Sequence, residues 1–336
     1  MQNYNEAEKI HSLIKSSHRI LIMQADNPDG DSLGCALALE QILGDLGKEP
    51  LLYCGVDIPT YLRHLPGWDR VSREVPNQFD LSIIVDCSSD SLFETLAKIG
   101  QRHWVAAKPA IVIDHHDVEN SIPYATVVCN QKAVATGEVI YELAQQLQWP
   151  LNKTAKDMLA VSILSDSLGL STEATTARSI HIIGELVEGG VSIPELEENR
   201  REMMRKAPEL VHYKGELLQR VEYFHDNRIA VITIPWEEIQ KYSPLYNPPM
   251  LVLDDMRLTT DTDIAIAFKT YNDGHVTAKI RCNFGKGIAN DLAQSFGGGG
   301  HAYASGFKVT DGRSFDEIKN TCIKKTAELL SELDNK

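Results

Sequence analysis

Short apolar runs alternate with amphipathic stretches along the first half of the chain. The runs are rich in Ile, Val and Leu and are bounded by turn residues, which is typical of buried parallel strands. They cover residues 19–24, 51–54, 81–86 and 110–116. Apolar residues recur at helical spacing over residues 31–48, 88–101, 135–148 and 152–170. This alternation predicts an α/β fold with a doubly wound parallel sheet.

The pattern changes after about residue 190. Residues 193–221 are charged and show helical periodicity without a strand pattern, so they predict a helical connector. Further strand-like runs cover residues 228–234, 263–271, 275–284 and 303–310, and a terminal helix is expected at 314–333. The sequence therefore predicts a first domain, a connector and a smaller C-terminal mixed-sheet α+β domain, at residues 1–190, 191–222 and 223–336.

Composition narrows the class of protein. The formal net charge of -14 argues against a protein that binds long duplex nucleic acid, because such proteins normally present a basic face. The six cysteines are scattered without a CxxC pair, which is typical of reduced thiols in the cytoplasm. No run approaches the ~20 apolar residues of a membrane span, so no membrane partner is expected.

Acidic and imidazole side chains follow several of the predicted strands. They lie in "NPDGD" (27–31) after the first strand, in "VDCSS" (85–89) after the third, in "DHH" (114–116) after the fourth, and in "SDS" (165–167) on a helix. Ligands of a doubly wound sheet bind beyond the carboxyl ends of its strands. We therefore expect these side chains to gather at one edge, namely Asp29, Asp31, Asp86, His115, His116 and Asp166.

Carboxylates combined with imidazole suit Mn²⁺ better than zinc, with Mg²⁺ or Co²⁺ as alternatives. An aspartate that bridges two ions ~3.5–4 Å apart would give a two-metal site of the kind that clamps in-line phosphoryl displacement. The competing interpretation is a set of solvated helix caps, with Asp31 capping a helix that starts at Ser32 and Asp86 capping one near Ser88. The convergence of four segments on one edge favours the metal site.

A second unusual stretch is "FGGGGHAYASGF" (296–307). Consecutive glycines occur where the backbone must approach something closely, and their N–H groups predict an anion-binding concavity. The glycines concerned are Gly297, Gly298, Gly299 and Gly300. His301 adds a donor, and Arg281 on the preceding strand could clamp the same anion in a bidentate manner. The alternative is a flexible linker between a helix and a strand.

Taken in this order and spacing, the five motifs resemble those of the DHH phosphoesterase superfamily. The closer resemblance is to the branch that joins a DHH domain to a C-terminal DHH-associated domain and that includes nano-RNases acting also as pAp phosphatases. It extends from about residue 5 to about residue 330. The resemblance implies a metal-dependent hydrolase of very short RNA or a phosphorylated nucleotide, working from an end of the RNA, and a homodimer.

The resemblance also implies a role for each matching residue. Asp29 and Asp86 would hold a first Mn²⁺ ion, and a second would be held by Asp31, Asp86, His115 and Asp166. Asp114 would orient a histidine, and His116 would face the scissile phosphate. The glycine run of the second domain, with the two basic residues beside it, would bind the substrate's terminal phosphate or nucleotide.

One position departs from the family pattern. The first motif usually opens with a histidine three residues before the proline, and Ala25 stands there. Alanine cannot bind a metal, so Gln24 or Asp26 would have to supply the oxygen ligand. A neutral amide is a weaker ligand than imidazole, so the first site would be loose, or selective for a different ion. Alternatively, one metal binds firmly and the other arrives with the substrate.

Two other functions remain open on the sequence. One is hydrolysis of cyclic dinucleotides or of their linear products. The other belongs to a different class of protein, a nucleotide-binding sensor that keeps the fold and has lost turnover, and Ala25 is its best support.

Overall fold

The computed structural model describes residues 2–117, 119–300 and 302–335. The chain forms two compact units, Met1–Arg205 and Lys206–Lys336. The segment predicted as a helical connector consists of two helices, α8 (Ile193–Met204) in the first unit and α9 (Pro208–Gln219) in the second. Pro208 occupies the first turn of α9, a position where its missing N–H costs no hydrogen bond.

The first unit contains the doubly wound parallel sheet that the sequence predicts. Its strands run in the order β2-β1-β3-β4-β5, and every pair is parallel. The strands are β1 (Arg19–Gln24), β2 (Glu49–Cys54), β3 (Leu81–Val85), β4 (Ala110–Asp114) and β5 (Val127–Asn130). The sequence pattern missed β5, a four-residue edge strand in which buried and half-buried residues alternate.

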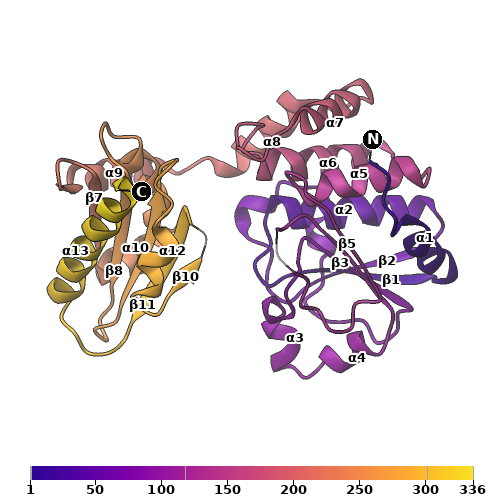
Figure 1. The fold of residues 1–336 in the computed structure, drawn as a ribbon, viewed down its shortest axis with the longest axis horizontal. Coiled ribbons are helices and arrows are strands. Elements are labelled where there is room, and N and C mark those ends of the chain that lie inside the picture. The colour runs from indigo at the N-terminus through magenta and orange to yellow at the C-terminus, as the bar shows by residue number, and fades with distance from the viewer. Residues whose placement is uncertain (1, 118, 301, 336) are drawn as a thin grey trace. The chain divides into compact units, whose positions relative to one another are not determined.

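Helices cover both faces of this sheet (Figure 1). One face packs against α1 (Ala7–Ser16), α2 (Gly30–Asp45), α5 (Thr136–Gln146) and α6 (Lys153–Asp166), with α7 (Ala177–Glu188) outside them. The other face packs against α3 (Glu94–Lys98) and α4 (Arg102–Ala106). The single helix predicted at 88–101 is wrong, because the non-helical backbone of Phe93 (φ -104°, ψ 50°) separates a short 3-10 helix at Asp90–Leu92 from α3.

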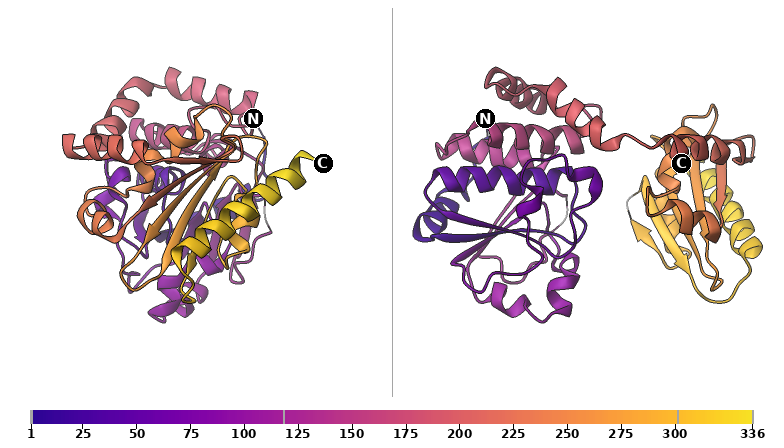
Figure 2. Two further views of the ribbon diagram at one scale, coloured as in Figure 1. Left: turned by 90° about the vertical axis from the view of Figure 1, so that its left-hand side faces the viewer. Right: turned by 180° about the vertical axis from the view of Figure 1, so that it is seen from behind.

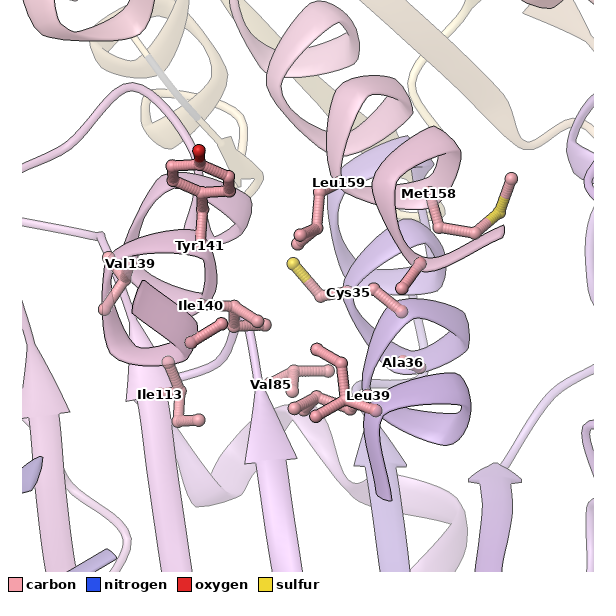
Figure 3. Close-up of a cluster of buried hydrophobic side chains, with 14 of the residues drawn as sticks. Cys35, Ala36, Leu39, Val85, Ile113, Val139, Ile140, Tyr141, Met158 and Leu159 are labelled. Atoms are coloured by element: carbon pink, nitrogen blue, oxygen red, sulfur yellow. The ribbon is translucent and has the colours of Figure 1, made fainter. Parts of the chain in front are cut away.

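Figure 3 shows the apolar layer between the first sheet and helices α2, α5 and α6. Val85 and Ile113 point up from β3 and β4, and they meet Leu39, Ile140 and Leu159 from α2, α5 and α6. Burying a side chain of this size stabilises the fold by about 1.5–3 kcal/mol. This layer therefore fixes the ends of α2, α5 and α6 over the carboxyl ends of the strands.

Glycines allow α2 and α6 to approach closely. A Cβ atom built on Gly30 would lie 2.2 Å from Oγ of Ser165, and one built on Gly34 would lie 2.8 Å from the carbonyl oxygen of Met158. Both distances are too short for a side chain to be added without a shift of α6. The glycines of "DGDSLG" thus bring the start of α2 against the end of α6.

The second unit is built on a mixed six-stranded sheet, as predicted. The strand order is β10-β11-β9-β8-β7-β6, in which β7 and β8 are parallel and the other pairs are antiparallel. The strands are β6 (Glu222–Phe224), β7 (Ile229–Ile234), β8 (Ile264–Thr270), β9 (Val276–Cys282), β10 (Gly299–Gly300) and β11 (Ala304–Val309).

Helices also lie on both faces of this second sheet (Figure 2). One face packs against α12 (Ala289–Gln294) and α13 (Phe315–Asp334). The other packs against α9, α10 (Trp236–Tyr242) and α11 (Pro249–Arg257). In the part of the chain that the structure describes, no helix is both long enough and apolar enough to cross a membrane.

The close contact between α2 and α6 can be tested with two glycine-to-alanine substitutions on α2. We expect Gly34→Ala to lower the free energy of unfolding by about 1–3 kcal/mol, because the new methyl group must push against the Met158 carbonyl. Gly44→Ala is the control, since nothing lies within 4 Å of its new Cβ, and alanine in a helix is favoured by about 1 kcal/mol. Urea unfolding measures both. Equal effects of the two variants would contradict the close approach.

Candidate metal centre at the carboxyl edge of the sheet

The acidic turn after β1 starts helix α2. Asp29 is the N-cap residue, and its side chain accepts hydrogen bonds from the N–H groups of Asp31 and Ser32, both at 3.0 Å. The helix therefore begins at Gly30, and the alternative in which Asp31 caps a helix starting at Ser32 is wrong. Asp31 instead lies inside the first turn and is fully buried.

Hydrogen bonds from three helices hold the Asp31 carboxylate. Its Oδ2 accepts from the N–H of Thr136 at the start of α5, at 2.8 Å. Its Oδ1 accepts from the Cys35 thiol at 3.2 Å and from the Ser162 hydroxyl on α6. Burial, followed by the negative charge of Asp166, raises the pKa of Asp31 to about 6. These donors fix the position of the carboxylate but supply no full positive charge.

The side chain of His115, directly after β4, lies at the centre of the site. Its Nδ1–H donates to the carbonyl oxygen of Ala133 at 3.2 Å, since a carbonyl can only accept. Its Nε2 is buried, forms no hydrogen bond within the described residues, and lies close to three carboxylates. The distances to their nearest oxygens are 3.3 Å for Asp166, 3.5 Å for Asp86 and 3.6 Å for Asp31.

Asp86 reaches this cluster through an unusual backbone conformation. It has a φ of 55°, in the left-handed region that aspartate tolerates better than most residues. Its Oδ1 accepts from the Thr136 hydroxyl at 3.2 Å. Burial raises the pKa of Asp86 well above its usual value, and the neighbouring charge of Asp31 raises it further. The alternative in which Asp86 caps a helix near Ser88 does not account for its contacts with Thr136 and His115.

The charges of the cluster determine what can bind there. Burial by itself would lower the pKa of His115, but the nearby carboxylates of Asp166, Asp86 and Asp31 outweigh it and raise that pKa to about 11. Two groups of side chains could each hold an ion, Asp31 with His115 and Asp166, and Asp86 with His115 and His116. A buried Nε2 without a hydrogen-bond partner, facing carboxylate oxygens, is a donor set that fits a divalent cation.

His116 and Asp114 form a pair beside this cluster. The Oδ1 atom of Asp114 accepts from Nδ1–H of His116 at 2.8 Å and from the N–H of His115 at 2.8 Å, and its Oδ2 accepts from the Ser88 hydroxyl. The hydrogen bond to Asp114 raises the pKa of His116. The His116 side chain is 42% exposed, so its other ring nitrogen can meet a ligand.

A pocket of about 230 Å³ opens next to His116. Its lining includes Asn130 and Lys132, which sequence reasoning missed because it missed β5. Asn130 donates from Nδ2 to the backbone carbonyl of His116 at 2.9 Å, and so helps to hold that loop. Lys132 is exposed and places a positive charge at the pocket. The alternating pattern of "VVCN" (127–130) is the feature of the sequence that could have revealed this strand and the residues at its end.

At the position of the family's missing histidine, the neighbouring side chains point to different sides of the sheet. These are Gln24, Ala25 and Asp26. Gln24 is fully buried, and neither of its amide atoms has a hydrogen-bond partner among the described residues. Strand alternation places it on the face of Ile22, which packs against α2. Ala25 belongs to the apolar cluster of the opposite face. Asp26 accepts from the N–H of Thr95 at 2.6 Å, so its carboxylate is directed towards α3.

In the second unit, Arg281 lies half-buried on β9. Its Nη1 donates to the carbonyl oxygen of Ile280 at 2.9 Å. None of the described carboxylates forms an ion pair with it, and burial lowers its pKa. An arginine that is partly desolvated and lacks an acidic partner can accept a phosphate at little cost in lost contacts.

The glycine run differs from the expected cradle. Gly297 and Gly298 donate their N–H groups to the carbonyl oxygens of Gln294 and Ala293, at 3.0 and 2.9 Å. Gly300 donates to the side chain of Asn290 at 3.1 Å, and Gly299 pairs with β11. The expectation of free N–H groups is therefore wrong for Gly297, Gly298 and Gly300, because α12 provides their acceptors. His301 lies outside the described residues.

Comparison with known proteins agrees with this architecture. Residues 19–164 match the DHH family, N-terminal domain. The chain is 22% identical over 321 residues to a Mycoplasma pneumoniae protein named bifunctional oligoribonuclease and PAP phosphatase NrnA, which covers 94% of this chain and 95% of that protein. A Bacillus subtilis protein of the same name is 24% identical over 306 residues, covering 89% of this chain and 92% of that protein.

A solved structure, described as an exopolyphosphatase-related protein from Bacteroides fragilis, has a TM-score of 0.85 to this chain. It is 19% identical and the match covers 97% of each chain, so the likeness concerns the fold. The family match, the relatives spanning nearly the whole chain and the fold together confirm the resemblance seen in the motifs. Residues 19–164 thus form a domain of the DHH family, and the similarity of the whole chain to proteins named as oligoribonucleases and PAP phosphatases supports a hydrolase.

Proposed function

We propose that this protein is a Mn²⁺-dependent phosphoesterase that hydrolyses very short RNA from an end and removes the 3′-phosphate from pAp. The observation that carries the proposal is the buried cluster of Asp31, Asp86 and Asp166 around Nε2 of His115. Relatives that match over nearly their whole length carry names describing an oligoribonuclease and PAP phosphatase, which supports the choice of substrate. A homodimer and a cytoplasmic location stay predictions.

The residues present fit two cations that share one carboxylate. One would be held by Asp31, Asp86, His115 and Asp166. The other would be held by Asp29 and Asp86, and the unpartnered amide of Gln24 is the available third ligand in place of the missing histidine. Bound divalent ions supply Lewis-acid stabilisation to a phosphoryl group and make water more acidic. Mn²⁺ suits a mixed set of carboxylate, amide and imidazole ligands.

His116 is suited to contact the substrate's phosphoryl group. Asp114 accepts its Nδ1–H, which fixes the ring orientation and directs Nε2 away from that carboxylate. Because Asp114 raises the pKa of His116, the ring carries Nε2–H as an imidazolium over a wider pH range. It can then donate to a phosphoryl oxygen on which negative charge develops. Lys132, beside the same pocket, adds a second positive charge.

Arg281 of the second unit is proposed to bind the terminal phosphate of the substrate. Its guanidinium forms no ion pair with a described carboxylate, although the charge of Asp254 acts on it, and a bidentate pair with phosphate would satisfy it. A substrate with a free terminal phosphate would then be placed by its end, which supports action on short chains rather than in the middle of long ones.

One observation favours a second candidate, a nucleotide-binding sensor without turnover. Ala25 occupies the position of the family's histidine and packs in an apolar cluster, so it supplies no ligand. The two candidates differ in turnover, which a direct assay measures.

The Asp86 carboxylate can be removed with little change in volume. Asparagine also tolerates the positive φ of this position. We expect Asp86→Asn to lower hydrolysis by at least about 100-fold, since loss of a residue that merely orients a ligand already costs about 10–100-fold. The assay incubates each protein with Mn²⁺ and pAp, dinucleotides, longer RNA or a cyclic dinucleotide, and separates the products.

In that assay the parent protein should act on pAp and on dinucleotides. Asp57→Asn, which removes an exposed carboxylate of the same unit, should act like the parent. Parental rates for Asp86→Asn would contradict the metal assignment. Tight nucleotide binding by the parent without any product would favour the sensor.

Removal of the Arg281 guanidinium should act on binding rather than on chemistry. We expect Arg281→Ala to raise KM for dinucleotides with a terminal phosphate by about 10–100-fold. This factor corresponds to the loss of a hydrogen bond to a charged group, which contributes ~1.5–3 kcal/mol. Substrates without that phosphate should change much less. Arg313→Ala, at an arginine of the same unit that already pairs with Asp311, is the control. Equal losses on both substrates in steady-state kinetics would refute the docking role.

Metal binding should release a proton from His115. Its pKa of about 11 means that the metal-free protein carries the imidazolium at neutral pH, and a cation must displace that proton from Nε2. The affinity for Mn²⁺ should therefore rise with pH between 6 and 8, by up to about tenfold per pH unit. Calorimetry in two buffers of different protonation enthalpy counts the protons. An affinity independent of pH, without proton release, would contradict this account.

A further inference from the structure

One face of the second sheet carries basic side chains that the proposed function leaves without a role. This is the face of β8, β9 and β11 that turns away from α12 and α13. The strand register places Lys269 and Lys308 on either side of Thr277, while Lys279 lies between Ala267 and Gly306. Three lysines therefore surround one small central residue, and no bulky side chain separates them.

These lysines have no acidic neighbours that would explain them as ordinary surface ion pairs. None of the described carboxylates pairs with Lys269, Lys279 or Lys308. Burial lowers the pKa of both Lys269 and Lys279, and the charges that act on them are cationic, Lys279 on Lys269 and Arg281 on Lys279. A protein with a net charge of -14 thus gathers like positive charges on one half-buried surface, an arrangement that an anion would stabilise.

The same surface is hollowed. A pocket of about 550 Å³ is lined by the three lysines, by Thr277, and by Gly297 and Gly298 of the glycine run. Its size is within the range of about 300–1,000 Å³ typical of small-ligand sites. The absence of side chains at the glycines leaves the floor of the pocket open. A phosphate group placed there could reach several ammonium groups at once.

An aromatic ring completes the pocket. Tyr271, just after β8, lines it and stacks on His275 with ring centroids 3.8 Å apart, which fixes the ring. Nucleotide bases stack on such rings with a gain of about 1–3 kcal/mol, irrespective of their sequence. Basic groups beside an aromatic surface are typical of sites for single-stranded nucleic acid. This combination favours a nucleotide chain over a simple inorganic anion.

We propose that the pocket of Lys269, Lys279 and Lys308 binds a further phosphate of the substrate strand, besides the terminal phosphate assigned to Arg281 and the scissile phosphate assigned to the metal centre. Lys279 and Arg281 are two residues apart on the same strand face, so their positions are roughly 7 Å apart along β9. The inference rests on the proposed function for the identity of the substrate. It adds that binding improves with the number of phosphates in the chain, so that a trinucleotide with a terminal phosphate binds better than a dinucleotide.

The test measures binding without hydrolysis. Fluorescence anisotropy is recorded in EDTA with 3′-labelled ribonucleotides that carry a 5′-phosphate and are two or three nucleotides long. We expect the parent to bind the longer probe more tightly. Lys279→Ala should weaken the longer probe about tenfold, should lower the slope of log affinity against log salt by about 0.7, and should leave the shorter probe within twofold.

Two matched variants exclude general effects of charge and folding. Lys324→Ala makes the same change of charge on α13, which covers the opposite face of the sheet, and should bind like the parent. Lys279→Arg keeps the charge and should restore most of the affinity. Equal weakening by Lys279→Ala and Lys324→Ala, or no weakening of the longer probe by Lys279→Ala, would overturn the proposal.

A competition arm identifies the ligand class. Unlabelled 5′-phosphorylated trinucleotide should displace the longer probe better than inorganic tripolyphosphate does, because the latter has no base for Tyr271. Equal displacement would overturn the assignment to a nucleotide strand. Failure of this inference is distinguishable from failure of the proposed function, because a protein that hydrolyses short RNA but binds both probes independently of Lys279 contradicts the inference alone.

Discussion

The carboxylates of Asp31, Asp86 and Asp166 approach a single imidazole nitrogen, Nε2 of His115, at 3.3–3.6 Å. Burying negative charges this close together is costly unless cations neutralise them. Within the described residues no lysine or arginine pairs with any of the three. The excess of negative charge is the constraint on which the rest of the first unit depends. Burial and this charge together raise the pKa values of Asp31 and Asp86, and the carboxylates raise that of His115.

The fold supports this unfavourable arrangement with ordinary packing. Parallel strands deliver Asp86 and His115 to the same edge, and the apolar layer beneath α2, α5 and α6 fixes the helices that carry the other ligands. Gly30 and Gly34 let α2 and α6 approach, so that Asp31 and Asp166 meet over that edge. Stability generated by the core thus holds a site that is locally unfavourable until a cation binds.

Much of this could be predicted from the sequence. Runs of Ile and Val gave four of the first five strands, and the acidic residues that follow them indicated the edge at which they meet. The edge strand β5 was missed because its pattern is short, and with it Asn130 and Lys132. The break at Phe93, before α3, depends on a backbone conformation that periodicity does not report.

Some structural features could not be predicted from the sequence, because they depend on strand register and on tertiary contacts. The acceptors for the glycine run come from α12, and the grouping of Lys269, Lys279 and Lys308 appears only when three strands are aligned.

The most direct test of the central claim is anomalous diffraction at the manganese edge from crystals grown with Mn²⁺. The account predicts a peak bonded to Nε2 of His115 and to the surrounding carboxylates. A map without such a peak, with these side chains turned apart, would contradict it.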